Sequence, residues 1–338
     1  MEKNKIVYVA RPRGFCAGVD RAIDTVELAL EVYGTPLYVK HAIVHNTYVV
    51  KHFSQKGVIC VDRVEDIPIG STVVFSAHGS SPEEFEQARD RGLHLIDATC
   101  PLVLKVHFEV NRFSRLGYDI IMVGHKGHTE PIGTLGNAQK PAHTFLVETQ
   151  KEAEKLVVPQ IEKLAVVTQT TLSIDETREV LDILKKRFPR AQFPQKQDIC
   201  YATTNRQQAV KNILPLIDTL CVVGSATSSN SNRLKELGSR HGLPSYLVDD
   251  VQSIDPSWFV HAHVVGVTSG ASVPEYLFEE VVAYFQQQGF AYIEGPSASY
   301  EDVHFALPSE LVKQAKKSKR GTYIVNKHTI ASGKKMRV

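Results

Sequence analysis

The sequence predicts an α/β protein built from three similar units, each a small parallel sheet flanked by helices. Short runs of β-branched and apolar residues alternate along the chain with longer helical patterns, as in parallel sheets covered by helices. The sequence that follows three cysteines, Cys16, Cys100 and Cys200, also repeats in register with a period near 100 residues. That period is too long for a solenoid and favours tandem small domains.

The repeat can be followed from the cysteines into the loops after the expected strands. Lys40 stands 24 residues after Cys16, and the first third follows the repeat more loosely than the others. Steps of 24 and 68 residues lead from Cys100 and Cys200 to glycines and threonines at the ends of apolar runs: Gly124, Thr168, Gly224 and Thr268. This register predicts one metal site where the three units meet.

Strands are expected where β-branched and apolar residues run together before a loop of small polar residues. These runs are 6–10, 71–76, 119–123, 164–167, 220–223 and 263–267. Helices are expected where helical patterns follow, and Ser81, Ser173 and Ser272 are suited to cap three of them. The expected helices are 20–32, 82–91, 101–116, 174–187, 206–214, 233–241 and 274–288.

The cysteine loops mark the expected boundaries between units. The divisions are a first unit with Cys16, a second with Cys100, a third with Cys200, and a C-terminal strap with a loose basic tail: 1–98, 99–198, 199–290 and 291–338. Lysine and arginine gather in this last segment at 316–320 and 334–337. Ligands of parallel sheets bind outside the carboxyl ends of the strands, and the candidate site residues fall in such loops.

Composition and charge exclude several classes of protein. The 338 residues are 43% hydrophobic and 22% charged, as in soluble globular proteins. With 39 basic against 37 acidic residues, the net charge of +2 gives no general attraction for nucleic acid or an anionic membrane. No stretch approaches the roughly 20 apolar residues of a membrane span, and the charged segment 1–5 is unlike a secretory signal. We expect a cytoplasmic protein without nucleic-acid or membrane partners.

Widely spaced cysteines in a cytoplasmic protein favour metal binding or catalysis over disulfides. Cys60 and Cys221 lie inside apolar runs and are expected to be buried core residues. Cys16, Cys100 and Cys200 have no Cys-x-x-Cys spacing, so the fold must bring them together. Three ligands would leave an open position on a metal. From spacing alone, an iron-sulfur cluster, a mononuclear metal and unrelated core cysteines all remain open.

Polar side chains gather in the loops of all three repeats. Histidine, serine, asparagine and helix N-terminal amides donate well to phosphate oxygens, and no Walker or dinucleotide glycine motif accompanies them. The loops therefore predict an anion site, although His45 or His78 alone could be an ordinary surface or core residue and Ser272 a helix cap. Glu130 would hold and donate a proton near a bound diphosphate; otherwise it is a first-turn acid that complements the helix dipole.

With these residues in view, the chain resembles the 4-hydroxy-3-methylbut-2-enyl diphosphate reductase family, which catalyses the last step of the methylerythritol phosphate route to isoprenoids. The resemblance runs from about Val7 to Leu307 and rests on a long, ordered set of motifs. The motifs are 13–19, 44–46, 76–79, 97–101, 127–130, 168–173, 200–206, 228–234 and 270–272.

The resemblance implies a trefoil of three α/β units around a central 4Fe-4S cluster. It implies that the cluster is held by Cys16, Cys100 and Cys200, with one iron open as a Lewis acid. It also implies Glu130 as the proton source and Thr171 as the partner of the substrate hydroxyl. The residues implied for diphosphate binding are His45, His78, His128, Ser228, Ser229, Asn230 and Ser272.

The activity implied is reductive removal of the hydroxyl group from an allylic diphosphate, giving both isopentenyl and dimethylallyl diphosphate. Reduced ferredoxin or flavodoxin would supply two electrons. One ring of three units per chain makes a monomer sufficient, and closure of a unit over the substrate is expected because the site must exclude water. The stretch after about Ala315 goes beyond the family core and has no assigned role.

Two other classes of function compete with the reductase. One is an iron-sulfur redox sensor whose basic tail binds nucleic acid. The other is a zinc hydrolase or phosphotransferase that uses the same anion site. Metal content separates the zinc enzyme from the others, and nucleic-acid affinity of the intact chain separates the sensor from the reductase.

Overall fold

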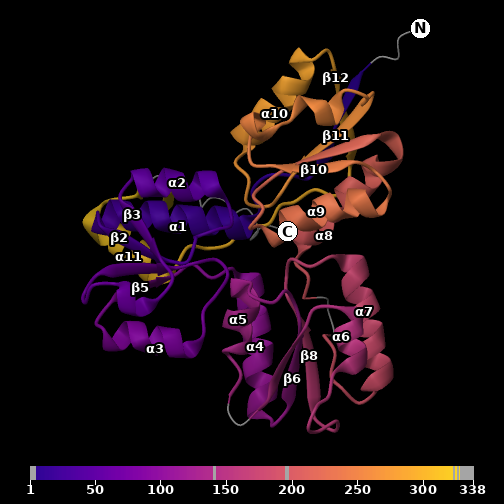
Figure 1. Cartoon of the computed structure of the whole chain (residues 1–338). Coiled ribbons are helices and arrows are strands. Elements are labelled where there is room, and N and C mark those ends of the chain that lie inside the picture. The colour runs from indigo at the N-terminus through magenta and orange to yellow at the C-terminus, as the bar shows by residue number, and fades with distance from the viewer. Residues whose placement is uncertain (1–4, 140–141, 195–197, 323, 326, 328–338) are drawn as a thin grey trace, which may run out of the picture.

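The chain forms three lobes around a common centre, each built on its own parallel sheet (Figure 1). This computed structural model describes residues 5–139, 142–194, 198–322, 324, 325 and 327. Within these residues, the first, second and third lobes hold four, three and five strands. The predicted α/β class and its trefoil arrangement are confirmed. Among the helices described, none is both long and apolar enough to cross a bilayer.

The first lobe has the strand order β3-β2-β4-β5, and the second has β7-β6-β8. All neighbouring strands are parallel, so their carboxyl ends share one edge of each sheet. The strands are β2 (Leu37–Lys40), β3 (Val58–Val61), β4 (Thr72–Phe75), β5 (His94–Asp97), β6 (Asp119–Val123), β7 (Thr144–Val147) and β8 (Leu164–Thr168). The helices are α1 (Ala17–Tyr33), α2 (Thr47–Gln55), α3 (Pro82–Asp90), α4 (Pro101–Arg115), α5 (Thr129–Leu135), α6 (Gln150–Lys155) and α7 (Ile174–Arg187).

The third lobe takes strands from both ends of the chain, in the order β10-β9-β11-β1-β12. Its strands are β1 (Ile6–Arg11), β9 (Thr219–Val223), β10 (Ser245–Val248), β11 (Val264–Ser269) and β12 (Ala291–Ser297), and its helices are α8 (Tyr201–Ile213), α9 (Ser229–Arg240) and α10 (Glu275–Gln287). β1 pairs in parallel with β11 and β12. The structure therefore places β1 in the third sheet rather than in the expected unit 1–98, and β12 extends that sheet beyond the expected end at 290.

Local sequence does not decide which sheet a strand joins. Val7 and Val9 of β1 are fully buried, as a strand between two neighbours requires. An apolar run of this kind fits the middle of any parallel sheet, because every strand edge offers the same backbone N–H and C=O groups. The partner of β1 thus depends on the three-dimensional course of the chain.

The period predicted from the cysteines appears as matching strands. Gly124 and Gly224 directly follow β6 and β9. Thr168 ends β8, and Thr268 lies in β11. The second and third repeats therefore place equivalent loops at the carboxyl ends of equivalent strands.

Each of the three cysteines stands at the N-cap of a helix. Cys16 precedes α1, Cys100 precedes α4 and Cys200 precedes α8. Helix α8 thus begins at Tyr201 rather than at the expected 206. Cysteine is not among the usual capping residues, so sequence rules place this start too late.

The two remaining cysteines differ in solvent exposure. Cys221 in β9 is fully buried, as predicted. The prediction for Cys60 is wrong, because this residue is exposed. It lies in β3 at the edge of the first sheet, where Ile59 is also exposed, so an apolar run there does not imply burial.

The C-terminal segment returns to the first lobe. Helix α11 (Ser309–Ser318) packs on α1 and buries Leu311 and Ala315. Ile324 and Val325 join the same apolar cluster, so the chain is packed here rather than loose as expected. The basic residues of 316–320 are exposed, and the second basic group, 334–337, lies outside the described residues.

Each lobe has its own apolar core. No apolar cluster of the described buried residues extends from the second sheet to the third. Between the first and third lobes, the partly buried Tyr48 of α2 packs on the third core and its hydroxyl bonds to Asp250. The second and third lobes are therefore joined by polar contacts.

Candidate active site

The carboxyl-end loops of the three sheets surround one central cavity of about 110 Å³. Side chains from all three lobes line it, which places residues from distant parts of the sequence side by side. The cavity contains every residue that the sequence singles out for a metal, an anion or proton transfer: Cys16, His45, His78, Cys100, His128, Glu130, Thr171, Cys200, Ser228, Ser229, Asn230 and Ser272.

The three cysteine sulfurs lie at helix starts, where backbone N–H groups and the helix dipole favour a thiolate. The sulfur of Cys200 accepts a hydrogen bond from the Thr203 backbone N–H at 3.4 Å. Gly18 leaves space beside the other two sulfurs. A Cβ at this position would lie 2.7 Å from Cys100 Sγ and 3.8 Å from Cys16 Sγ. The glycine therefore opens room for a group held by these cysteines.

Burial raises the pKa of all three thiols, of Cys100 to about 12 and of Cys200 to about 11. The charge of Cys16 raises the pKa of both others, so the sulfurs are close enough to repel one another as thiolates. Metal ions would supply the positive charge that keeps them deprotonated. In the part of the chain that is described, no group of three or more His, Cys, Asp and Glu could hold one metal ion. Cysteine thiolates are the ligands that iron-sulfur clusters take.

Arg206 joins the first and third cysteine loops. Its fully buried guanidinium donates to the carbonyl of Gly14, two residues before Cys16, at 2.8 Å. Glu301 pairs with the same guanidinium at 3.1 Å. Because Arg206 lies on the helix that Cys200 begins, it fixes that helix against the loop of Cys16.

Arg21 joins the first and second cysteine loops in the same way. Its guanidinium donates to the carbonyl of Thr99, beside the second cysteine, at 3.0 Å and to that of Ala306 at 2.7 Å. The Tyr201 hydroxyl adds a further link by accepting from the Ala17 backbone N–H at 3.2 Å. These bonds hold the three helix starts in one arrangement.

Three imidazole rings from two lobes pack against one another in the cavity, tilted or edge to face. The ring centroid of His45 lies 4.1 Å from that of His78 and 4.9 Å from that of His128. Burial, with the neighbouring imidazoles, lowers the pKa of His45 to about 4 and of His128 to about 3, and holds the pKa of His78 well below its usual value. All three are neutral at neutral pH and would gain protons beside an anion.

Several polar atoms of the cavity are buried without a hydrogen-bond partner among the described residues. They are His45 Nε2, His128 Nε2 and both polar side-chain atoms of Asn230. His128 Nδ1 accepts from the Glu130 backbone N–H at 3.2 Å, so its Nε2 carries the proton and is a donor. Unpaired buried donors are costly, and an anionic ligand would satisfy them.

The serine hydroxyls link the lobes around the cavity. Ser228 caps α9, accepting from its backbone. The Ser229 hydroxyl donates to the Thr171 carbonyl at 3.2 Å, and that of Ser272 to the His45 carbonyl at 2.9 Å. These two hydroxyls therefore tie the third lobe to the second and the first at the rim of the anion site.

Glu130 has the properties of a proton donor at neutral pH. Its side chain is buried at 3% exposure, and burial raises its pKa to about 7. The Thr170 backbone N–H donates to Glu130 Oε1 at 2.6 Å, which orients the carboxyl and opposes the shift. A group with this pKa can both give and regain a proton near pH 7.

The Thr171 hydroxyl is oriented by a buried amide. Gln169 Nε2 donates to Thr171 Oγ1 at 3.0 Å, and Gln169 Oε1 accepts from the His125 backbone N–H at 3.0 Å. Thr171 therefore has its own proton left to donate to a ligand oxygen.

Sequence reasoning did not assign a role to Gln169, Arg21, Arg206 or Gly18. Gln169, Arg206 and Gly18 fall inside the motifs that carry the resemblance. A signal was available for the arginines, because Arg21 and Arg206 each lie within two turns of the cysteine that begins their helix. The carbonyls of Thr99 and Gly14 lie 78 and 192 residues away from them along the chain, so these contacts are visible only in the folded protein.

The sequence matches the family described as LytB protein over residues 7–286. The chain is 50% identical over 306 residues to the 4-hydroxy-3-methylbut-2-enyl diphosphate reductase of Tolumonas auensis, covering 90% of this chain and 99% of that protein. It is 49% identical over 306 residues to the protein of the same name from Actinobacillus pleuropneumoniae serotype 5b, covering 90% and 98%.

Two solved structures are similar to this one. The E-1-hydroxy-2-methyl-but-2-enyl-4-diphosphate reductase from Plasmodium falciparum superposes with a TM-score of 0.90 at 38% identity, covering 94% of this chain and 99% of that chain. An (E)-4-hydroxy-3-methyl-but-2-enyl diphosphate reductase, described as the terminal enzyme of the non-mevalonate pathway, gives 0.59 at 32% identity, covering 84% and 99%. These matches confirm the resemblance that the motifs indicate, and the chain belongs to the LytB protein family.

Proposed function

We propose that this protein reduces (E)-4-hydroxy-3-methylbut-2-enyl diphosphate to isopentenyl and dimethylallyl diphosphate. The observation that carries the proposal is the central cavity, which combines three buried thiols, imidazole donors and a carboxyl with a pKa of about 7. Relatives that match over nearly their whole length are named for this activity. Their names favour the reductase over the redox sensor and over the zinc enzyme.

Cys16, Cys100 and Cys200 are the residues that would hold a 4Fe-4S cluster. When bound, a cluster with three protein ligands supplies single electrons and one iron that is open as a Lewis acid. The space beside Gly18 and the mutual repulsion of the three thiolates support this assignment.

The diphosphate of the substrate would bind among the three histidines and the start of α9. His45, His128 and Asn230 bring the buried polar atoms that have no partner among the described residues. His78, Ser228, Ser229 and Ser272 line the same space. An imidazole that gains a proton beside the anion makes a charged hydrogen bond, which strengthens binding of the diphosphate. The anchored substrate then presents its hydroxyl end to the rest of the cavity.

Glu130 and Thr171 would act on the departing hydroxyl group. The reaction breaks one C–O bond and forms a single C–H bond, at one end or the other of the allyl group. It consumes two electrons and two protons for each water released. Glu130 gives one proton to the leaving oxygen, so that water rather than hydroxide departs. Thr171 donates a hydrogen bond to the same oxygen. Glu130 is buried and Thr171 partly buried, which limits the access of bulk water to the reacting group.

The remaining parts of the proposal concern partners and location. Reduced ferredoxin or flavodoxin is the proposed electron donor, since the reaction takes up electrons one at a time. A monomer is sufficient because one chain supplies every residue that lines the cavity. We place the protein in the cytoplasm and propose that the lobes close over the bound substrate.

The test is to purify the protein without oxygen and to measure iron, sulfide and turnover with reduced methyl viologen. About four iron and four sulfide per chain, with both isoprenoid diphosphates formed, would support the proposal. Cys16→Ser should lose the cluster or nearly all turnover, whereas Cys60→Ser, at an exposed position outside the cavity, should keep both. Iron-free protein that consumes substrate, or iron-loaded protein that forms no product, would refute it.

A further inference from the structure

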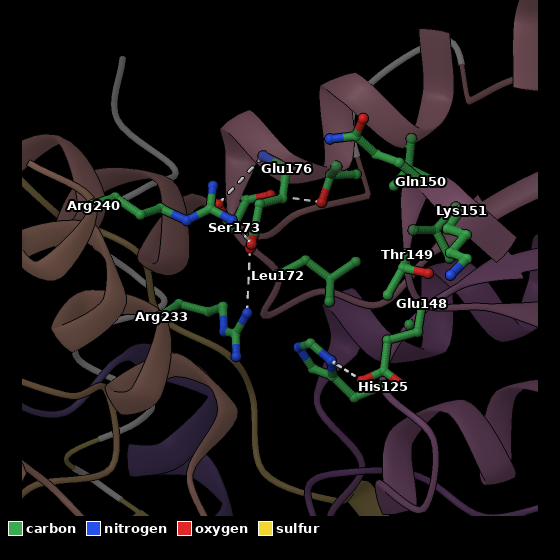
Figure 2. Close-up of a pocket in the computed structure, with 14 residues that line it drawn as sticks. His125, Glu148, Thr149, Gln150, Lys151, Leu172, Ser173, Glu176, Arg233 and Arg240 are labelled. Atoms are coloured by element: carbon green, nitrogen blue, oxygen red, sulfur yellow. Dashed lines mark hydrogen bonds and ion pairs between the residues drawn. The ribbon is translucent and has the colours of Figure 1, made fainter. Parts of the chain in front are cut away.

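A second cavity, of about 450 Å³, separates the second and third lobes outside the central site (Figure 2). Its lining comes from the carboxyl end of the second sheet, the first turns of α6 and α7, and helix α9. No apolar cluster of the described buried residues crosses between these lobes. Polar contacts therefore set the spacing of the two lobes, among them those around this cavity and the hydrogen bonds of Gln207 to the start of α7.

One carboxylate spans the cavity from the second lobe to the third. Glu176, in the first turn of α7, pairs with Arg233 at 3.2 Å and also with Arg240. Figure 2 shows both guanidinium groups directed toward Glu176. The two arginines lie two turns apart on one face of α9, so a single carboxylate can reach both. We call these three residues the Glu176 clasp.

The Glu176–Arg233 pair of the clasp is partly shielded from water, whereas the Arg240 side chain is 50% exposed. The side chains of Arg233 and Glu176 are 16% and 32% exposed. Arg233 is held from the other side by Glu236 at 2.6 Å, which aligns the guanidinium along the surface of α9. Ion pairs at this level of burial are screened less by salt than surface pairs and contribute more.

The clasp joins two helix starts that belong to the central site. Ser228, Ser229 and Asn230 form the start of α9, and Thr171 lies just before α7. The same two helix starts touch directly where the Ser229 hydroxyl donates to the Thr171 carbonyl. His128 also belongs to the second lobe. A diphosphate that binds both His128 and the start of α9 must therefore span the gap that the clasp controls.

We propose that Glu176 is a positioning residue that sets the spacing between the diphosphate donors of α9 and those of the second lobe. It acts through Arg233 and Arg240 and does not touch the ligand. The inference rests on the proposed function only for the identity of the ligand, since binding of a diphosphate can be measured without reduction.

The ion pair of Asp175, in the same turn of α7, offers a matched control when it is broken from the side of its partner, Lys211. Asp175 pairs with Lys211 of α8 at 2.7 Å, so it also joins the second lobe to the third. Helix α8 begins at Tyr201, where the chain itself passes between the lobes. The charge of Asp175 also acts on Arg240 of α9, so the control replaces Lys211 and leaves Asp175 in place. Losing this ion pair should therefore leave the spacing at the start of α9 unchanged.

The experiment measures binding of inorganic diphosphate to the cluster-loaded protein by calorimetry, together with substrate kinetics. Glu176→Gln keeps the size of the side chain and removes its charge. We expect the affinity for diphosphate to fall about tenfold and KM to rise by a similar factor, with kcat within about threefold of the parent. Iron content should not change and the melting temperature should fall by at most about 4 °C, while Lys211→Gln should bind diphosphate as the parent does.

A double-mutant cycle tests the route through Arg233. Glu176→Gln combined with Arg233→Gln should be no weaker in diphosphate binding than the poorer single variant, because both remove the same contact. Unchanged affinity in Glu176→Gln, an equal loss in Lys211→Gln, or additive losses in the double variant would each overturn the proposal. Should the affinity for diphosphate depend on the clasp while the protein reduces no substrate, the proposed function fails and the positioning role stands.

Discussion

The amide of Gln169 donates to the hydroxyl oxygen of Thr171 at 3.0 Å and is itself fully buried. Its oxygen is already engaged by the backbone N–H of His125 at 3.0 Å, so the amide cannot turn over without losing both bonds. The direction of the hydrogen bond is thereby set, and the proton of Thr171 remains available to the substrate. Gln169 thus orients the Thr171 hydroxyl, whereas the sequence resemblance implied only that Thr171 contacts the substrate hydroxyl.

Gln169→Leu should lower turnover while the cluster is retained. The substitution leaves the His125 backbone N–H unpaired and the Thr171 hydroxyl without its donor, a loss of about 1–3 kcal/mol. If that loss falls on the transition state, kcat drops by roughly tenfold to a hundredfold. Single-turnover rates with the reduced protein measure it.

Gln169→Glu provides the sharper comparison for this prediction. The carboxylate still accepts from His125 but offers no proton to Thr171, so the threonine hydroxyl would donate to it instead of to the substrate. Turnover should fall as in Gln169→Leu. Parental turnover in Gln169→Glu would show that the direction of this hydrogen bond does not matter.

The pH dependence of turnover should report the Glu130 carboxyl. Its pKa is raised to about 7, so the protonated form that can donate is lost as the pH rises through that value. We expect kcat to decline from pH 6 to pH 8 in the parent protein. Glu130→Gln should reduce kcat by about a hundredfold or more and should abolish this decline.

Cluster content and diphosphate binding serve as controls for Glu130→Gln. Both should be unchanged, because the carboxyl is placed at the proton-donating end of the cavity and glutamine preserves its volume. A variant that keeps the same pH profile would assign the titration to another group. Full turnover in the variant would remove Glu130 from the mechanism.

Binding of inorganic diphosphate should take up protons. In the absence of ligand His45 and His128 have pKa values of about 4 and about 3, so both are neutral at pH 7. An adjacent anion favours the imidazolium form and raises these values. Calorimetric titrations at pH 6.5 in buffers of different ionisation enthalpy measure the protons taken up. His128→Asn should bind more weakly and take up fewer.

The same histidines predict how folding stability changes with pH. Unfolded histidine titrates near 6.5, above the folded values, so the contribution of the neutral rings is complete above pH 6.5 and is lost as the pH falls toward 4. Urea unfolding at pH 7.5 and pH 5 should show this loss. A free energy of unfolding that changes equally with pH in the parent and in His128→Asn would contradict it.

Gly18→Ala should impair retention of the cluster. The added methyl group would lie 2.7 Å from Cys100 Sγ, a distance that real Cβ contacts do not show, so the sulfur must move. Alanine is otherwise well tolerated in a first helical turn, and the fold should persist. Iron and sulfide analysis, with circular dichroism as the check on folding, decides the outcome. Full cluster content in Gly18→Ala would show that the space beside this glycine is not needed.

The sequence alone was sufficient for features that depend on neighbouring residues. Helix α7 was predicted at 174–187 and is observed over the same span, because a serine cap and a helical apolar pattern are local signals. The period that relates Cys100 to Cys200 likewise identified equivalent loops before any strand was placed. The residue types of the site could be named for the same reason, since cysteine, histidine and serine loops follow apolar runs in each repeat.

Only the tertiary structure decided which sheet β1 joins, that Cys60 is exposed, and that buried arginines hold the cysteine loops together. It also decided that the pKa of Glu130 lies near 7, because that shift arises mainly from burial of the carboxyl in the folded chain. Strand pairing, burial and desolvation depend on groups far apart in the chain. A short stretch of sequence therefore cannot predict strand pairing, burial or desolvation. Helix capping and helical periodicity can be predicted, because their signals lie within about ten consecutive residues.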